Sequence, residues 1–407
     1  VEKVEKIKIQ PVLVGGDINC YSVARAYHEA YGVKSIAFGK MLLGATKDSN
    51  IIDFRIDPNM GNKDEFIKVL LKTADELAEP NKKLIIHGCT DEYAELIIDY
   101  RDVLSEKYIV PYIGAELKDK LIEKELFYNM CEEYGLDYPK TYIYNKGDEI
   151  GDFGFNYPVI LKASDSISFF QNAFEGMNKA YLIQDEEEFK REIEKIYSHG
   201  YEKSMIVQDY IPGDDSHMRV LTCYSDQNGK VKMQCLGHVL LEEHTPKGIG
   251  NHAAIITEYD EEVMTKFKNF LESINYTGFS NFDIKYDTRD NSYKVFEINL
   301  RQGRSNYYVT SSGNNIAKYV VEDRVYNKEL DLKVQKEPFF WRCIPKQVVY
   351  KYVKDPELVK KCKELDTKGK SATSFGYKAD LKGNLKRSSY IFLYYVNQFR
   401  KYKKYCK

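Results

Sequence analysis

The sequence predicts an α/β fold with an α+β centre, on the basis of two observations. An apolar segment, Pro11–Val14, leads through a glycine turn into a predicted helix over Cys20–Tyr31, which is how a βαβ unit begins. Later in the chain, Asn281–Asp287 and Tyr293–Arg301 alternate apolar and polar residues on either side of a turn, as in an antiparallel hairpin. The length of 407 residues is enough for two to four packed units.

Composition and charge are those of an ordinary globular protein. Hydrophobic residues make up 43% of the chain and charged residues 30%, and the formal net charge is −2. This charge provides no general attraction for nucleic acid, and no apolar segment approaches the roughly 18–20 residues needed for a transmembrane span. Eight widely spaced cysteines without a C-x-x-C pair favour buried free thiols. We expect a cytoplasmic protein; its oligomeric state stays open.

Residues 1–115 are predicted to form an N-terminal Rossmann-like domain. Its first turn, Gly15–Asn19, lacks the full G-x-G-x-x-G spacing of a dinucleotide site. Further strands are expected at Val33–Phe38 and Lys82–His87, with a helix between them at Lys63–Leu77. Such a domain binds ligands at the carboxyl ends of its strands or serves only as a scaffold. We favour a scaffold with some substrate contact.

The hairpin at residues 281–301 carries the strongest functional signal. Alternation along its second strand places Glu297 and Asn299 on one face. If the hairpin is symmetric about Asp290, Asp283 lies directly opposite Glu297, with Cβ atoms about 5 Å apart. Two carboxylates and an amide oxygen are ligands that hard divalent cations prefer. The hairpin therefore predicts a metal site of Asp283, Glu297 and Asn299; a polar surface hairpin is the alternative.

Four basic residues are placed to bind anions. Lys162 ends an apolar strand, where an ammonium group is unfavourable unless an anion pairs with it. Lys124, on a helix expected over Leu121–Tyr134, is a second candidate for the same phosphate. Either lysine alone could instead extend its charge into solvent. Arg301 and Arg304 follow the metal strand, as anion-binding groups beside a metal would.

Two further segments could contact a nucleotide or substrate. Met205–Ile211 is predicted to be a strand whose exposed edge could bind an adenine ring, with an Asp of the following Pro212–Asp215 turn near the ribose. Taken alone, this segment is better explained as an ordinary strand and turn. The glycine-rich segment Glu242–Asn251, which contains Lys247, could close over a substrate or form a long surface hairpin.

The C-terminal segment, residues 329–407, ends in a basic and aromatic stretch. From Lys382 to Lys407 there are eight Lys and Arg residues and no acidic residue. The favoured interpretation is a solvated helix face with the Tyr390–Val396 run buried. The alternative is attraction to an anionic partner, such as a nucleotide-linked substrate or peripheral contact with a membrane surface.

Taken in order, these features resemble the ATP-grasp superfamily. They are Lys124 on a helix, Lys162 at the end of P-V-I-L-K, the Q-D-Y-I-P-G hinge at 208–213, and then Asp283, Glu297 and Asn299. The resemblance covers residues 12–325. It implies an ATP-grasp fold with two lysines on the ATP phosphates and Mg²⁺, or Mn²⁺, on the Asp, Glu and Asn.

Within that superfamily, five segments resemble the peptidoglycan D-aspartate ligases. They are A-R-A-Y-H-E-A-Y-G-V-K-S (24–35), M-C-E-E-Y-G-L-D-Y-P (130–139), Q-D-Y-I-P-G-D-D-S-H-M-R-V-L (208–221), N-Y-T-G-F-S-N-F-D-I-K-Y-D (275–287) and F-E-I-N-L-R-Q-G-R-S-N-Y-Y-V-T (296–310). This resemblance implies that ATP phosphorylates the side-chain carboxylate of D-aspartate. The activated carboxylate would then be joined to the lysine side-chain amine of a UDP-MurNAc-pentapeptide. The alternatives are an ATP-grasp amino-acid or peptide ligase with other substrates, and an inactive nucleotide-binding regulator.

The resemblance also implies domains and residue roles. The domains are a Rossmann-like domain (1–115), an ATP-grasp small subdomain (116–205), a large subdomain with the metal hairpin (206–328) and the C-terminal segment (329–407). The expected ATP-binding residues are Lys124, Lys162, Ser168, Gln208, Asp209, Tyr210, Ile211 and Asp215. The expected catalytic residues are Lys162, Arg301, which would stabilise an oxyanion, and Arg304, which would grip a substrate carboxylate.

Two departures from the superfamily pattern concern the phosphate site. The loop after Lys162, A-S-D-S-I-S-F-F-Q-N, has no glycine to cover the phosphates with its backbone. Ser164, Ser166 and Ser168 could bind phosphate instead. Lys120 lies one helical turn before Lys124 and could compete for its role.

Overall fold

The computed structural model describes residues 7–246 and 248–406, with only the backbone described at Ser166 and Ile167. It comprises two compact units, which are described separately. The main unit contains the chain before Lys120, Asp214–Ile284 and the chain from Ile298 onward; the small unit contains Lys120–Gly213 and Lys285–Glu297. The finer division into four domains stays a prediction.

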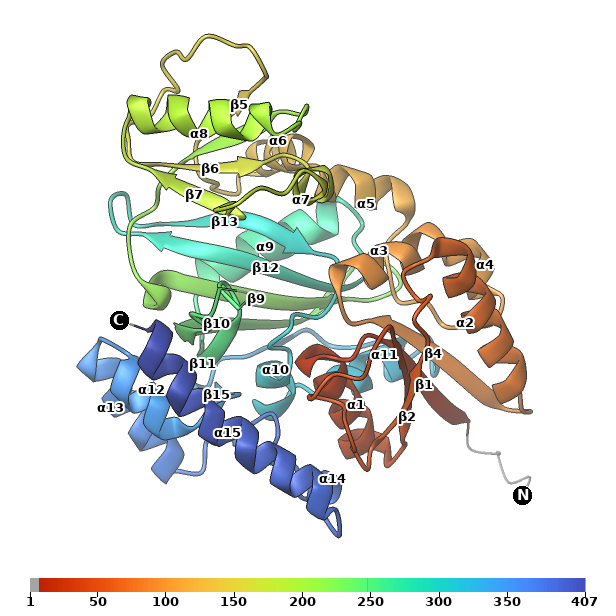
Figure 1. Ribbon diagram of the computed structural model, residues 1–407. Coiled ribbons are helices and arrows are strands. Elements are labelled where there is room, and N and C mark those ends of the chain that lie inside the picture. Colours follow the sequence, from red (N-terminus) through yellow and green to blue (C-terminus); the bar gives the residue numbers. More distant parts are fainter. Residues whose placement is uncertain (1–6, 247, 407) are drawn as a thin grey trace. The chain divides into compact units, whose positions relative to one another are not determined.

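The main unit begins with a four-stranded parallel sheet in the order β3-β2-β1-β4. Its elements are β1 (Lys8–Val14), α1 (Ile18–Tyr31), β2 (Ser35–Gly39), β3 (Ile52–Ile56), α2 (Lys63–Leu77), β4 (Lys82–Gly88), α3 (Asp91–Asp99), α4 (Arg101–Ser105) and α5 (Ala115–Ile122). In β1, Val12 pairs with both Ile36 and Ile86, so this strand is interior and its sequence is apolar on both faces. The parallel pairing and the alternating helices confirm the predicted Rossmann-like start (Figure 1).

A second sheet of eight strands has the order β13-β12-β9-β10-β11-β15-β16, with β14 paired to β10. Its strands are β9 (Met218–Ser225), β10 (Val231–Glu242), β11 (His252–Glu258), β12 (Gly278–Asp287), β13 (Ser292–Asn299), β14 (Lys333–Val334), β15 (Phe340–Arg342) and β16 (Ser371–Thr373). The accompanying helices are η1 (Asp215–His217), α9 (Glu261–Ser273), α10 (Tyr307–Ser311), α11 (Ile316–Arg324), α12 (Lys346–Tyr352), α13 (Pro356–Thr367), α14 (Lys378–Leu381) and α15 (Leu385–Tyr405). Strands β12 and β13 are the predicted hairpin, and the division between the units runs through it.

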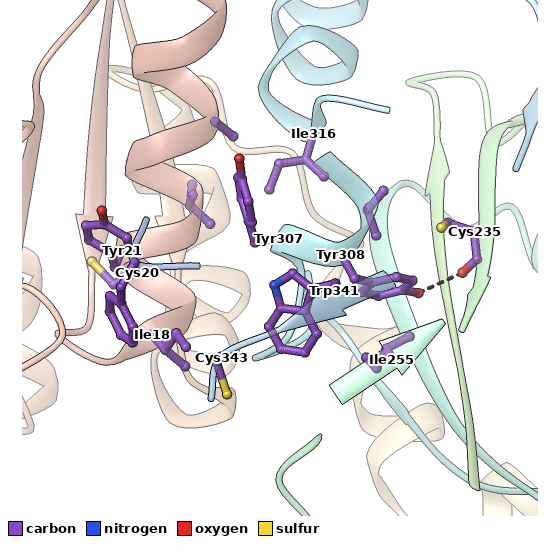
Figure 2. Close-up of a cluster of buried hydrophobic side chains, with 14 of the residues drawn as sticks. Ile18, Cys20, Tyr21, Cys235, Ile255, Tyr307, Tyr308, Ile316, Trp341 and Cys343 are labelled. Carbon is purple, nitrogen blue, oxygen red and sulfur yellow. Dashed lines mark hydrogen bonds between the residues drawn. The ribbon is translucent and has the colours of Figure 1, made fainter. Parts of the chain in front are cut away.

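The core of the main unit joins residues from distant parts of the sequence. Tyr21 from α1, Tyr308 from α10 and Trp341 from β15 are all fully buried in one cluster, shown in Figure 2. Tyr308 donates a hydrogen bond of 2.7 Å to the carbonyl of Cys235, which removes the penalty of burying its hydroxyl (Figure 2). The eight cysteines are free and seven are buried, as predicted.

The small unit has an antiparallel sheet in the order β5-β8-β6-β7. Its elements are α6 (Lys124–Glu133), β5 (Thr141–Tyr144), β6 (Val159–Ala163), α7 (Ser166–Gln171), β7 (Ala180–Ile183), α8 (Glu186–Ser198) and β8 (Met205–Asp209). Leu161, Phe189, Ile196 and Val207 form part of its core. Their spacing follows the strand and helix periods that the sequence displays.

Three predictions about these elements are wrong. The helix expected over Leu121–Tyr134 is divided, because Glu123 is extended (φ −70°, ψ 116°) between α5 and α6. The segment after Lys162 is not an open loop: Asp165 caps the short helix α7 by accepting from the Ser168 amide at 3.0 Å. The strand at Met205 ends at Asp209 and has no exposed edge, because β5 and β6 pair with its two sides.

The C-terminal helix differs from the prediction at its apolar run. Within Tyr390–Val396, Ile391 is buried, but Phe392 and Leu393 are 66% and 62% exposed. An α-helix has 3.6 residues per turn, so neighbouring residues in a continuous apolar run cannot all face the core.

Lys247, in the segment between β10 and β11, lies outside the described residues.

Candidate active site

In the small unit, a lysine and a carboxylate from distant segments form an ion pair. Lys124 is the first residue of α6, and its Nζ lies 2.9 Å from Oε2 of Glu297 on β13. Lys124 also donates to the Phe296 carbonyl at 3.4 Å, and Tyr128, one turn further along α6, donates to the same carbonyl at 3.0 Å. The charge of Lys124 lowers the pKa of Glu297 to about 2. Glu297 is therefore a carboxylate at any physiological pH.

Lys162 ends β6 in the same unit, close to this ion pair. Burial and the charge of Lys124 lower the pKa of Lys162 to about 7, although the negative charge of Glu297 acts in the opposite direction. Within residues 7–246 and 248–406, the structure gives the Lys162 ammonium no hydrogen bond or ion pair. An ammonium group held in this way gains more from a bound anion than a solvated lysine would.

The predicted nucleotide residues around β8 are held by their neighbours in the small unit. Gln208 is buried and donates to the Tyr128 hydroxyl at 2.8 Å and to Thr141 Oγ1 at 2.9 Å. The Asp209 carboxylate accepts hydrogen bonds from Nη1 and Nη2 of Arg289, at 3.1 and 2.7 Å. Tyr210 and Ile211 follow the end of β8, so their backbone groups lie beyond its strand ladder.

Two other predicted nucleotide residues lie in caps or turns. Ser168 is in the first turn of α7, where its amide is held by Asp165. Asp215 begins η1 in the main unit, and its carboxylate accepts from the Glu242 amide at 2.8 Å and contacts His244 Nε2 at 2.7 Å. The structure therefore does not bring Asp215 and the lysines together within one unit.

Two of the three predicted metal ligands meet in the main unit. Asn299 Nδ2 donates to Asp283 Oδ2 at 3.2 Å and to the Asn281 carbonyl at 3.2 Å. A half-turn of this amide group would present its oxygen beside the Asp283 carboxylate, since the two amide heavy atoms are nearly the same size. Glu297 precedes Asn299 by two residues on β13, which is one full alternation of a strand. These oxygen donors fit Mg²⁺.

No cluster of three or more His, Cys, Asp or Glu side chains that could hold a metal occurs in the described part of the chain. The predicted site differs from such clusters because one of its three ligands is an amide oxygen.

Arg301 is the first of two arginines that follow β13. Its guanidinium lies 2.9 Å from the Asp91 carboxylate, and its Nη2 is 3.4 Å from Asn299 Oδ1. Burial alone would lower the pKa of Arg301, but Asp91 and Asp283 outweigh it and raise that pKa. Its Nε is buried and has no hydrogen-bond partner among the described residues. A buried donor without a partner has an unmet hydrogen-bonding requirement, which a bound anionic oxygen would satisfy.

Arg304 lies among carboxylates of the same unit. Its Nη2 is 3.2 Å from Glu243 Oε1, and its Nε is 3.9 Å from Asp17 Oδ2. Asp17 also caps α1 by accepting from the amides of Asn19 and Cys20 at 3.1 and 3.3 Å. Burial raises the pKa of Asp17, and Arg304 offsets this only in part. The cluster thus combines an arginine with two acids, which suits a ligand that carries both an ammonium and a carboxylate.

Asp17, Asp91 and Glu243 were not among the predicted site residues. Asp17 and Asp91 each lie within three residues of the carboxyl end of a parallel strand, β1 and β4. Ligands of open α/β sheets bind at those ends, so the sequence did contain a signal for these two residues. Glu243 follows the last residue of β10 and lies in the segment Glu242–Asn251 that could close over a substrate, but no pattern in the sequence singled out its carboxylate.

Comparisons with known proteins agree with this fold. The structure is similar to that of N5-carboxyaminoimidazole synthetase from Staphylococcus aureus complexed with ADP (TM-score 0.57, 15% identity, 82% of each chain covered). The chain is 23% identical over 292 residues to the D-alanine–D-alanine ligase of Wolbachia sp. subsp. Brugia malayi (strain TRS), covering 65% of this chain and 83% of that protein. No family model matches the chain.

The fold is the ATP-grasp fold, and the protein is an ATP-grasp carboxylate–amine ligase. It is 40% identical over 416 residues to the D-aspartate ligase of Enterococcus faecium (strain Aus0004), covering 99% of this chain and 98% of that protein. The chain belongs to the D-aspartate ligase family.

Proposed function

We propose that this protein uses ATP to join the side-chain carboxylate of D-aspartate to the lysine side-chain amine of a UDP-MurNAc-pentapeptide. The observation that carries this proposal is the likeness to the Enterococcus faecium D-aspartate ligase, which extends over 99% of this chain. A likeness that includes both the N-terminal sheet and the C-terminal helices supports the same substrates and not only the same fold.

We assign the ATP phosphates to Lys124 and Lys162. Support comes from their positions in the small unit, where Lys162 has a pKa lowered to about 7 by burial and by Lys124. A phosphate anion would stabilise both ammonium groups and form charge-assisted hydrogen bonds with them. Lys124 would exchange its present partner, Glu297, for the nucleotide. The remaining ATP-binding residues in this proposal are Ser168, Gln208, Asp209, Tyr210, Ile211 and Asp215.

Asp283, Glu297 and Asn299 are the residues that would hold Mg²⁺, with Mn²⁺ as a substitute. When bound, the ion neutralises charge that develops on the transferring phosphate oxygens. The proposal is supported by the hard oxygen donors of these side chains and by the ionised state of Glu297.

The reaction proceeds in two steps. The side-chain carboxylate of D-aspartate attacks the γ-phosphorus of ATP, which releases ADP and leaves an acyl phosphate. The lysine amine then attacks the acyl carbon, phosphate leaves, and the amine proton passes to solvent. Arg301, whose buried Nε lacks a partner in the described chain, would donate to the oxyanion formed in the second step.

We assign the recognition of the amino acid to the cluster around Arg304. Its guanidinium would bind a carboxylate of aspartate in a bidentate manner. Asp17 and Glu243, at 3.9 and 3.2 Å from Arg304, are placed to receive the ammonium group of the same molecule. We further propose that the enzyme acts in the cytoplasm, which agrees with its free cysteines.

A ligase with other substrates is the second candidate. It is favoured by the 23% identity to a D-alanine–D-alanine ligase over 292 residues. That protein joins two amino acids, so its likeness supports the shared ligase chemistry and leaves the substrates to be tested.

The test is a coupled assay of ADP release with a panel of amino acids and acceptors. We expect release with D-aspartate and the UDP-linked lysine-containing pentapeptide, and little with L-aspartate. Release with D-alanine in place of D-aspartate would support the second candidate. Nucleotide binding without release for any pair would reject both and favour a regulator.

A further inference from the structure

Helix α15 exposes large apolar side chains on the side that faces away from the core. We call this side the outer face of α15; its large apolar residues are Leu385, Phe392, Leu393 and Phe399. Phe392 and Leu393 are 66% and 62% exposed, and Leu385 is 84% exposed. Residues 385, 389, 392, 396, 399 and 403 recur at three and four positions, so they follow one side of the helix.

The same face is strongly basic. Lys386, Arg400, Lys403 and Lys404 are exposed on α15, and the chain has no acidic residue after residue 381. The rest of the protein is acidic, since the eight basic residues of this end leave 52 basic and 62 acidic residues elsewhere. A negatively charged surface would therefore attract this end of the protein and repel the remainder.

The opposite side of α15 is held to the main unit along its length. Arg387 is fully buried, pairs with Asp380 at 3.0 Å and donates to the carbonyls of Gly44, Ala45 and Lys47. At the other end, Tyr402 donates to the Glu242 carbonyl at 2.7 Å. The helix cannot turn its apolar residues inward without breaking these bonds. Figure 1 shows α15, in dark blue, along the border of the main unit beside α12 and α14.

A second copy of the chain is a poor occupant for this face. In a two-fold symmetric dimer the same surface meets itself, so the basic residues of this face would approach basic residues of the other copy. The helix contains no acidic residue that could neutralise them. A helix with exposed Phe and Leu beside Lys and Arg instead has the composition that binds at the surface of anionic bilayers.

We propose that the outer face of α15 binds an anionic lipid bilayer, with Phe392 and Leu393 in the interface and the neighbouring basic residues among the headgroups. The helix lies on the membrane and does not cross it; no helix of the described chain is long and apolar enough to do so. This inference goes beyond the proposed ligase activity and does not depend on it.

Co-sedimentation with vesicles tests the proposal. We expect the full chain to bind vesicles of equal parts phosphatidylglycerol and phosphatidylcholine, and to bind phosphatidylcholine vesicles weakly. The double substitution Lys403→Glu and Lys404→Glu should weaken vesicle binding at least about tenfold. The reason is that each basic residue near an anionic surface strengthens binding several-fold, and the substitution removes two of them. Phe392→Ser with Leu393→Ser should weaken binding that persists at high salt, where charge attraction is screened.

The matched control places the same charge change on another exposed surface. Lys361 and Lys368 are exposed on and just after α13, and Lys368 lines a lysine-rich hollow of about 840 Å³. Lys361→Glu with Lys368→Glu should leave vesicle binding within about twofold. Equal loss in the control would mean general charge attraction and would overturn the proposal. So would equal binding to both vesicle types, or self-association that the Phe392 and Leu393 substitutions abolish in sedimentation velocity.

The vesicle result is separate from the result for ligase activity. All four substituted residues of α15 are exposed and are outside the proposed site, so ADP release with a soluble acceptor should be unchanged. Loss of ADP release together with an altered far-UV spectrum would identify a folding defect. In that case, the unmodified chain decides the question: stronger binding to the phosphatidylglycerol-containing vesicles, with a part that persists at high salt, supports the proposal, and equal binding to both vesicle types overturns it.

Discussion

At the residue scale, Glu297 is the side chain on which two proposed roles meet. It pairs with Lys124 in the structure and is proposed to bind the metal ion in the nucleotide complex. We predict that Glu297→Gln lowers ATP turnover about a hundredfold or more, since it removes a charge that acts on the transferring phosphate. The free energy of unfolding should change by less than about 1 kcal/mol, because the pair is partly exposed.

A matched control exists in the same unit. Lys146 and Glu202 form an exposed ion pair at 2.6 Å, and Glu202→Gln removes the same charge. Steady-state ADP release should be unaffected there. Equal losses of turnover in the two variants would show that the charge of the unit matters and the position of Glu297 does not.

Lys162 should link nucleotide binding to proton uptake. Burial and Lys124 lower its pKa to about 7 in the free protein, and a bound phosphate would raise it. Below pH 7, Lys162 is already charged in the free protein, so nucleotide binding takes up few protons. Between about pH 7 and 10, Lys162 is neutral in the free protein and must gain a proton when the nucleotide binds. Nucleotide affinity should accordingly fall as the pH rises above 7.

Calorimetry in buffers of different ionisation enthalpy measures this uptake directly. We expect close to one proton per nucleotide at pH 8 and much less at pH 6. Lys162→Met should bind more weakly and take up no proton at pH 8. Unchanged uptake in that variant would assign the proton to another group and contradict our account of Lys162.

The site was only partly accessible from the sequence at this scale. Glu297 and Asn299 could be placed on one strand face because alternation is a local property. Arg301 could be proposed as an anion-binding residue, but its contact with Asp91 joins positions 210 apart in the sequence, and no local pattern encodes it. The same is true of the pairing between Lys124 and Glu297, which are separated by 173 positions.

At the scale of elements, Gly278 is where a single backbone position controls a strand. It begins β12 with φ of +88°, and a Cβ placed there would lie 2.1 Å from the Pro111 carbonyl oxygen. Gly278→Ala should therefore destabilise the main unit by about 2 kcal/mol or more, from strain together with the clash. At Gly32, φ is +69° with open space around it, and Gly32→Ala should be milder, at about 1 kcal/mol.

Trp341 is a suitable probe for this comparison. It is the single tryptophan of the chain and is buried in the core of the main unit, so its fluorescence during urea unfolding reports on that unit. If Gly278→Ala lowered the free energy of unfolding less than Gly32→Ala does, the backbone near Pro111 would have to relax easily, contrary to our prediction.

Elements with a clean period were predicted well. Helix α2 has the predicted limits, since its burial follows the spacing of its apolar residues. The break between α5 and α6 was missed because Glu123 is neither glycine nor proline, and only its backbone angles reveal it. The flanking of β8 by two strands was missed because strand order is a long-range property.

At the scale of the whole molecule, the same chain supplies two kinds of chemistry. The small unit holds the lysines proposed for the nucleotide phosphates. The main unit holds Arg301 and the Arg304 cluster, which are proposed for the oxyanion and the amino acid. Segments 120–213 and 285–297 interrupt the main unit, so the hairpin that carries Asp283 and Glu297 belongs to both units. The fold class could be inferred from the order of the lysines, the 208–213 hinge and the hairpin along the sequence. The extent of each unit could be seen only in the structure.

The most direct test of the central claim follows an oxygen atom. We propose that ATP activates the side-chain carboxylate as an acyl phosphate, so an oxygen of that carboxylate must leave with the phosphate. With D-aspartate labelled by ¹⁸O in its side chain, mass spectrometry should find one ¹⁸O atom in the released phosphate for each amide formed. Unlabelled phosphate, or label in AMP, would contradict this mechanism.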